Sequence, residues 1–339
     1  MTEFTSLTRA RFLRLAAGAS LAGLGGSLAR AQAPVELRYG HMNPPASAAG
    51  IQAQMLADEI AKNSAGGVKV TVYPSSQLGK LQELAEAVST GSIALSHNTA
   101  AGIGSLYEPF GALDTPYLYK DFAHLMRVMD VNGPVLKALN EGLIKAAGVR
   151  VLYAYYFGTR HLTANKAIRE PADLAGMKIR AIPFPIYNTA VQGLGAVPIP
   201  VDWSEVPTAL ATGTVNGQEN PANVILSSKL YETQSHMMLT GHIMNAQLIV
   251  MNERVWQRLT PAQRDAISAA AAKVSKEASE MVRKTESEEI EKLKGLKMNV
   301  IGPAEGLKVE AFRASVGKLV QERFGAKFAD LYKQVAALG

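Results

Sequence analysis

Short apolar strands and amphipathic helices alternate along the first half of the chain. Apolar residues Ile51, Met55, Leu56 and Ile60 recur at helical spacing within 47–63, which predicts a helix. Residues 68–73 (VKVTVY) alternate between apolar and polar side chains, which predicts a strand. The predicted order is strand 35–41, helix 47–63, strand 68–73, helix 78–90, strand 93–96 and strand 149–157. Strands that alternate with helices form crossover units, so we expect an α/β fold with a parallel or mixed sheet and helices on its faces.

The second half repeats this alternation and then carries a long helix. The predicted order is strand 177–182, helix 186–194, strand 197–199, helix 204–212 and strand 246–251. Residues 261–294 contain no glycine and follow Thr260, a good N-cap, while Gly295 is expected to end the helix. At 1.5 Å per residue, about 34 residues span roughly 51 Å. Because this length exceeds one small lobe, we expect the helix to lie across two lobes.

Residues 1–31 have the features of an export signal. Three arginines precede an apolar stretch at 15–28, and a small-residue cleavage sequence ends at Ala31. The stretch is too short to span a bilayer, which takes about 20 residues. We therefore expect cleavage near Ala31 and a periplasmic mature chain. The Arg-Ala-Arg sequence at 9–11 resembles a degenerate twin-arginine signal, so the Sec and Tat export routes both stay open.

Charge and cysteine content exclude several classes of function. The chain has a net charge of +6, and residues 1–31 supply half of it through four arginines and one glutamate. The remainder has no run of Lys and Arg, which argues against a nucleic acid or a membrane surface as partner. The chain has no cysteine, which excludes a catalytic thiol, a thiolate zinc site and a disulfide.

Motifs for cofactors and catalysis are missing from the sequence. It contains no phosphate loop, no dinucleotide-binding glycine motif, no HExxH and no GxSxG. The six histidines fall on separate elements, with no pair at the spacing of a helical metal site. Asp202 and Glu205 flank the start of a predicted helix, where they are expected to cap it rather than to act as acid and base. We therefore expect no cofactor, no metal and no enzymatic activity.

Two arginines stand in segments that otherwise have the pattern of buried structure. Arg180 lies in the strand MKIRAI between Ile179 and Ala181, and Arg160 directly follows the predicted strand 149–157. The carboxyl end of an α/β strand is where open sheets bind their ligands. A buried guanidinium requires an anion, because it stays charged and presents a planar fork of donors. The residues alone leave an internal carboxylate and a bound ligand as equal alternatives.

A series of short sequence blocks resembles the DctP-type solute-binding proteins of TRAP transporters, which are tripartite ATP-independent periplasmic carriers. The four most characteristic blocks are Gly176–Arg180, Gly195–Pro198, Ser204–Gly213 and Val215–Pro221. The lead-in at 165–174, the stretch PSSQLG at 74–79 and the long C-terminal helix extend the resemblance over essentially the whole mature chain.

This resemblance implies a two-lobe clamshell of α/β domains with a long helix spanning both lobes. We expect a first lobe of 32–157 plus 246–275, a second lobe of 158–245 plus 286–313, the spanning helix at 261–294 and a C-terminal helix at 314–339. Bending between the lobes is expected near Phe157, near Asn245 and in the long helix around 275–288.

The resemblance also assigns ligand-binding residues. It implies that Arg180 pairs with the ligand's carboxylate, with Arg160 as a neighbouring second arginine and Asn220 as an amide that shares the carboxylate. Further candidates are the aromatics Trp203 and Phe184 against the ligand body, and Asn43, Asn98 and Gln77 from the first lobe.

Each of these residues also has a purely structural alternative. Arg160 could position Glu219, Trp203 could be a core tryptophan, and Asn220 before Pro221 could end a turn. The sequence departs from the family at Pro183-Phe184-Pro185, directly after the arginine strand, so no relative's ligand is carried over.

The implied function is capture of a small organic acid and its delivery to the small and large subunits of a TRAP membrane permease. The alternatives are a ligand-binding partner of a membrane sensor, or a periplasmic carboxylate-processing enzyme, for which Tyr187, Ser204, Glu205 and His161 offer no recognisable order of partners. The aromatic candidates favour a ligand with an apolar or planar body. Both a monomer and a homodimer stay open.

Overall fold

A computed structural model describes residues 33–339, so the predicted signal peptide lies outside the described residues. Pro34–Gly339 form one compact unit around a mixed sheet of nine strands in the order β2-β1-β3-β8-β4-β7-β5-β6, with β9 beside β8. Within residues 33–339, no helix combines the length and the hydropathy needed to cross a membrane.

The first lobe is built on one end of this sheet. Its strands β1 (Val35–Gly40), β2 (Val68–Tyr73) and β3 (Leu95–Asn98) are parallel to one another, as the alternation with helices predicts. Its helices are α1 (Ala48–Asn63), α2 (Leu81–Thr90), α3 (Ala100–Ile103), α4 (Phe122–Val128) and α5 (Pro134–Ala147), with a 3₁₀ turn at Glu108–Asp114. Ser47 caps α1 by accepting from the Gly50 amide, which fixes the predicted start of this helix.

The second lobe is built on the other end of the sheet. Its strands are β5 (Lys178–Ala181), β6 (Val197–Pro200), β7 (Gly217–Pro221) and β9 (Asn299–Ile301). Its helices are α6 (Pro185–Gly193), α7 (Val206–Ala211) and α8 (Ala222–Ser227), with short 3₁₀ turns at Pro171–Leu174, Trp203–Glu205, Leu230–Glu232 and Pro303–Glu305. Strand β7 is fully buried although its middle residues, Gln218 to Asn220, are polar, and no strand is expected there from the sequence pattern.

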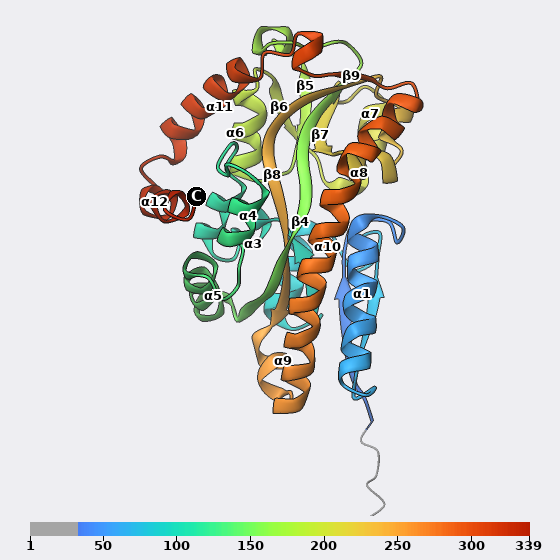
Figure 1. Cartoon of the computed structure of the whole chain (residues 1–339), viewed down its shortest axis with the longest axis vertical. Coiled ribbons are helices and arrows are strands. Elements are labelled where there is room, and N and C mark those ends of the chain that lie inside the picture. Colours follow the sequence, from blue (N-terminus) through green and yellow to red (C-terminus); the bar gives the residue numbers. More distant parts are fainter. Residues whose placement is uncertain (1–32) are drawn as a thin grey trace, which may run out of the picture. The chain divides into compact units, whose positions relative to one another are not determined.

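Two long strands, β4 (Val149–Ala164) and β8 (His236–Asn252), run through both lobes and pair antiparallel with each other (Figure 1). The expected end of β4 at Phe157 and start of β8 at Ala246 are wrong. Gly158 looks like a strand end in the sequence, but at φ +118° it lets the chain continue through a register shift opposite Asn245. The polar residues beyond it are paired with β7 on one side and β8 on the other.

Helix α10 (Pro261–Gly295) packs along the long strand β4 and runs from one lobe to the other, as its length predicts (Figure 1). Thr260 caps it by accepting from the Gln263 amide. The short helix α9 (Glu253–Arg258) precedes it.

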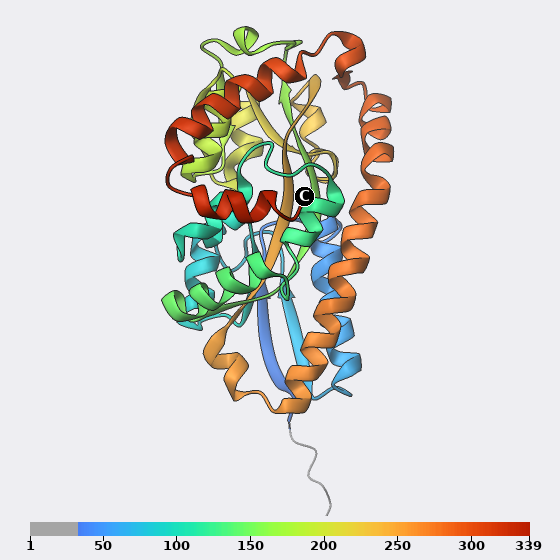
Figure 2. The same ribbon diagram turned by 60° about the vertical axis from the view of Figure 1, so that its left-hand side comes forward.

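The single C-terminal helix expected at 314–339 is wrong. The chain turns at 325–328 and so forms two helices, α11 (Val309–Phe324) and α12 (Ala329–Ala336) (Figure 2). At this turn Phe324 stacks on Phe328. Helix α11 packs on the second-lobe core, whereas Val335 of α12 belongs to the first-lobe core. The C-terminal segment therefore joins both lobes. The proposed chain boundaries of the lobes stay a prediction.

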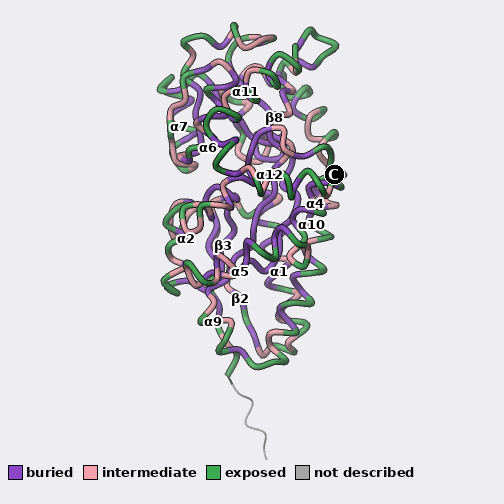
Figure 3. Tube along the Cα trace, turned by 90° about the vertical axis from the view of Figure 1, so that its left-hand side faces the viewer, coloured by how far each residue is buried: buried purple, intermediate pink, exposed green. Residues whose placement is uncertain are grey.

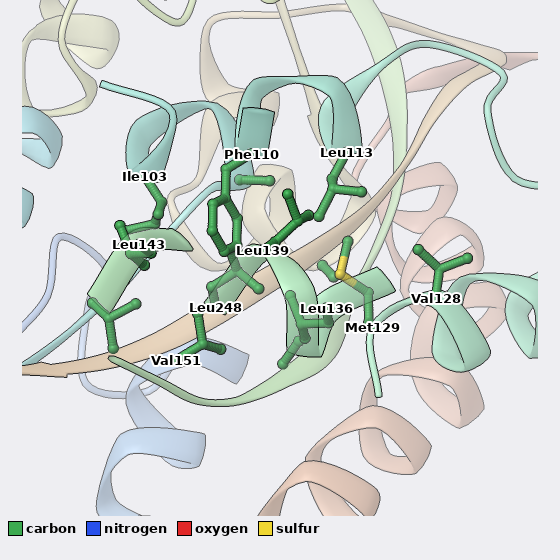
Figure 4. Close-up of a cluster of buried hydrophobic side chains, with 14 of the residues drawn as sticks. Ile103, Phe110, Leu113, Val128, Met129, Leu136, Leu139, Leu143, Val151 and Leu248 are labelled. Carbon is green, nitrogen blue, oxygen red and sulfur yellow. The ribbon is translucent and has the colours of Figure 1, made fainter. Parts of the chain in front are cut away.

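Each lobe has apolar cores on both faces of the sheet, so the strands are largely buried and the outer helix faces exposed (Figure 3). In the first lobe, Leu136, Leu139 and Leu143 of α5 pack on Val151 and Leu248 of the long strands (Figure 4). A further cluster contains residues of both lobes, namely Leu81, Ala101, Ala112, Ile182, Phe184, Ile186, Tyr187, Ala190, Ile243, Phe324 and Phe328. These shared contacts hold the lobes together.

Candidate ligand-binding site

A cavity of about 40 Å³ lies between the lobes, at the carboxyl ends of the parallel strands. The first lobe contributes Met42, Asn43, Leu81, Thr99, Phe157 and Gln247. The second lobe contributes Arg160, Arg180, Ile182, Pro183, Asp202, Trp203, Asn220 and Val224. This place agrees with the general position of ligands in open α/β sheets.

Arg180 is a buried cation without a carboxylate partner. It is 3% exposed near the end of β5, and its Nε donates to the Val201 carbonyl at 2.8 Å. Within residues 33–339, its two Nη nitrogens form no hydrogen bond and no carboxylate lies within salt-bridge distance. Burial lowers the pKa of Arg180 to about 10, so the guanidinium still carries its charge at neutral pH. The two free Nη groups have the geometry that binds a carboxylate through both oxygens.

Arg160 has an internal partner. Its Nε and Nη2 donate to the two carboxylate oxygens of Glu219 at 2.5 and 2.8 Å, and Nη2 also donates to the Glu219 carbonyl at 2.7 Å. The Glu219 carboxylate also lies 3.1 Å from His242 Nε2. Arg160 lies within β4 rather than beyond its end. Its ion pair with Glu219 matches the structural alternative named from the sequence, in which Arg160 positions Glu219.

Electrostatics in this buried group keep Glu219 ionised. Burial alone raises the pKa of Glu219, but the charge of Arg160 and the hydrogen bonds from His242 and Arg160 outweigh it and bring the pKa to about 2. The Arg160–Glu219 pair is thus electrically balanced within the protein. Arg180 is the cation of the cavity lining that is left without such a balance in the described part of the chain.

Three other predicted residues also line the cavity. Trp203 places its ring centre 5.8 Å from the Arg180 guanidinium carbon, on the second-lobe side. Asn220, at the end of β7, donates through Nδ2 to Gln218 Oε1 at 2.5 Å. Asn43 holds His97, whose Nε2 lies 3.1 Å from Asn43 Oδ1. The structure therefore brings Arg180, Arg160, Asn220, Trp203 and Asn43 to one cavity.

The remaining three predicted residues lie outside the cavity lining. Asn98 is buried below it and donates to the Leu81 carbonyl at 2.8 Å, which anchors the start of α2. Phe184 packs in the apolar cluster that both lobes share. Gln77 is exposed in a turn. For Phe184, the turn through Pro183 and Pro185 directs the ring into the core, away from the position expected for a ligand contact.

Sequence reasoning missed several lining residues. Gln247 is the polar side chain of the apolar strand AQLIVM, and that exception to the pattern is a signal that could have found it. Thr99 follows β3 directly and caps α3 by accepting from the Gly102 amide. Asp202 is also in the lining, but its side chain caps no helix, contrary to expectation.

Asp202 instead takes part in an ionic contact between the lobes. Lys80, just before α2 in the first lobe, places Nζ 2.9 Å from Asp202 Oδ2 and 3.0 Å from Glu205 Oε1 in the second lobe. These hydrogen bonds raise the pKa of Lys80. The contact joins the two lobes next to the cavity, since Asp202 is also a lining residue.

We predict that Lys80→Met weakens ligand binding a few-fold, because the contact stabilises the closed form in which both lobes touch the ligand. The wild-type affinity should fall with added salt, and the variant should lose most of that dependence. Titration calorimetry at low and high sodium chloride measures both effects. Lys62→Met, at an exposed lysine far from the cavity, is the control. An unchanged affinity at low salt would show that Lys80 has no part in closure.

Comparisons with known proteins agree with this architecture. The family model for bacterial extracellular solute-binding protein family 7 (DctP) matches residues 39–327. A solute-binding protein of Verminephrobacter eiseniae is 33% identical over 298 residues, which is 88% of each chain. A TRAP periplasmic solute-binding protein of Bordetella bronchispeptica, with density attributed to pantoate, aligns with a TM-score of 0.82 at 30% identity over 89% of this chain and 98% of that one. A TRAP protein of Polaromonas sp., bound to D-erythronate, aligns with a TM-score of 0.82 at 31% identity over 90% and 98%.

Proposed function

Because the chain belongs to the DctP family of bacterial extracellular solute-binding proteins, we propose that it captures a small organic acid between its lobes and delivers it to a TRAP-type membrane permease. The observation that carries this proposal is Arg180, a buried guanidinium in the cavity lining with two unpaired Nη nitrogens and no carboxylate partner among residues 33–339.

The charge of Arg180 determines the class of ligand. A buried cation without a counter-ion is costly, and a carboxylate offsets that cost while accepting two parallel hydrogen bonds. Each charge-assisted hydrogen bond contributes about 1.5–3 kcal/mol. Pantoate and D-erythronate, the ligands of the two structural relatives, are both carboxylates. Trp203 and the apolar lining residues would cover the body of the acid.

Binding and release depend on lobe movement. The cavity of about 40 Å³ is lined by residues of both lobes, and an acid would enter and leave it when the lobes separate. First-lobe contacts exist only in the closed form, and the ligand therefore shifts the population toward that form by its differential affinity. We expect the bending near Phe157, near Asn245 and in the long helix around 275–288 to produce this movement. The register shift beside the Gly158–Asn245 pair supports this place for the bend.

Delivery requires a partner in the membrane. Small and large permease subunits, or a fused carrier, would recognise a surface that the two lobes form together in the closed state. A signal peptide cleaved near Ala31 would release the protein into the periplasm. Both a monomer and a homodimer are compatible with this role.

A thermal-shift screen of the protein from Gln32 onward tests the proposed function. Organic acids are compared with their amides or methyl esters, which keep the shape and remove the charge. A ligand at 100 times its Kd adds about 2.7 kcal/mol of stability, which raises the Tm of a chain of this size by a few degrees. Shifts with acids and none with the neutral analogues would support carboxylate capture. Equal shifts with both, or none with any acid, would refute it.

A further inference from the structure

Unpaired polar atoms gather on the first-lobe side of the cavity. Gln247 is 3% exposed, lines the cavity and has no hydrogen-bond partner for Oε1. His41 is 1% exposed, and neither of its ring nitrogens has a partner. Buried polar groups in native proteins are nearly always hydrogen-bonded, so these atoms require a partner in the working state.

The sheet places these side chains on one face at its cavity end. Gly40 pairs with Ser96, so His41 falls beside His97, and their ring centres lie 5.1 Å apart. His97 contacts Asn43, whose side chain lines the cavity. Asn98 pairs with Leu248, which places Thr99 opposite Gln247, and both residues line the cavity. Gln247, Thr99 and Asn43 thus form the polar part of the first-lobe surface of the cavity, and Asn43 contacts His97 behind it.

This surface carries no charge. Burial lowers the pKa of His41 to about 4 and that of His97 well below its usual value, so both rings are neutral at pH 7. The other first-lobe lining residues are amides, a hydroxyl and apolar side chains. Both lining arginines belong to the second lobe, and one of them is already paired with Glu219.

Resting on the proposed function, we infer that the first-lobe surface of Gln247, Asn43 and Thr99 is a second subsite, which binds an uncharged hydrogen-bonding group of the ligand, a hydroxyl or a carbonyl. The ligand is then a monocarboxylate whose carboxylate lies on Arg180 and whose polar far end lies on this surface. A second carboxylate at this place would be desolvated without a counter-charge, so dicarboxylates are disfavoured.

The two subsites select for different chemical groups of the ligand. Arg180 selects for a negative charge, whereas the first-lobe subsite selects for neutrality at the other end. A site built to hydrogen-bond a hydroxyl strongly disfavours an analogue that lacks it, because its own polar groups are then left unpaired. The apolar side chains between the subsites, such as Ile182 and Val224, would contact the carbon chain.

Calorimetry with matched acids tests this inference. Unbranched acids of three to six carbons are titrated as the plain acid, the terminal hydroxy acid and the dicarboxylate, for example butanoate, 4-hydroxybutanoate and succinate. At the best-fitting length, we expect the hydroxy acid to bind about tenfold tighter than the plain acid and the dicarboxylate to bind weakest. Gln247→Leu should remove the preference for the hydroxy acid, so that the hydroxy acid no longer binds more tightly than the plain acid of the same length. Gln257→Leu, at an exposed glutamine of α9, is the control.

The outcomes separate the two proposals. Binding of plain acids with no gain from the hydroxyl, or tightest binding of dicarboxylates, would overturn the second subsite and leave carboxylate capture intact. Failure of every acid to bind would overturn both. If Gln247→Leu does not fold, the acid series on the wild-type protein decides alone.

Discussion

Replacement of Arg180 by methionine is expected to weaken binding of the ligand acid by about three orders of magnitude. The variant loses two charge-assisted hydrogen bonds of about 1.5–3 kcal/mol each, and every 1.4 kcal/mol corresponds to about tenfold in Kd. Arg180→Lys is expected to lose about 10- to 100-fold, because a point charge cannot replace the planar fork. Titration calorimetry with the best acid from the screen measures both losses.

The ligand-free stability of Arg180→Met separates a binding role from a structural one. Arg180 makes one hydrogen bond, from Nε to the Val201 carbonyl, and its buried charge has no carboxylate partner in the described residues. Removing a desolvated, uncompensated charge costs little stability, so the midpoint of urea unfolding should stay the same or rise. Arg258→Met, an exposed arginine of α9, controls for the loss of one positive charge. A strong drop in stability together with retained affinity would contradict the role given to Arg180.

Replacement of Glu219 by glutamine is expected to destabilise the folded protein by about 3–5 kcal/mol, because it leaves the buried Arg160 without its counter-ion. Arg160 and Glu219 are both nearly fully buried, so solvent does not screen this loss. Urea unfolding at pH 7 measures it. The double variant Arg160→Met/Glu219→Leu should regain most of the stability, since it removes both charges.

The Glu219 carboxylate also makes the stability of the folded protein depend on pH. The pKa of Glu219 is about 2 in the folded protein, below the ordinary value of 4.5 that applies to the unfolded chain. Its contribution to the free energy of unfolding is therefore fully present above about pH 4.5 and is lost as the pH falls toward about 2. The difference in stability between wild type and Glu219→Gln should shrink over that range. A constant difference from pH 7 to pH 2.5 would contradict this assignment.

Local pattern was sufficient to predict the elements that have one buried face and a clear cap. The start of α1 after Ser47 and that of α10 after Thr260 follow from side chains that accept the first free amides. Strand β7 escaped prediction because Gln218, Glu219 and Asn220 read as a polar loop. Their partners lie on other elements, such as Thr163 and Arg160 of β4, and no local pattern reveals them.

The candidate site likewise contains residues that the sequence pattern identifies and residues that it does not. Arg180 could be identified from the sequence because a charged residue interrupts an apolar strand and because the surrounding motif resembles a known family. Lys80 and Asp202 are 122 residues apart and meet only when the lobes close, so neither carries a local signal. Gln247 interrupts an apolar strand as Arg180 does, but an amide in a strand is a weaker signal than a charge. The first-lobe half of the site is therefore determined by tertiary contacts that the local sequence pattern does not reveal.

The position of the bound carboxylate shows whether Arg180 is the anion-binding residue. The measurement is a crystal structure of the protein with the acid that gives the largest thermal shift. We predict both carboxylate oxygens on the two Nη nitrogens of Arg180, with the body of the acid against Trp203 and its far end toward Gln247. A carboxylate bound away from Arg180, or an acid turned so that its carboxylate faces Gln247, would contradict it.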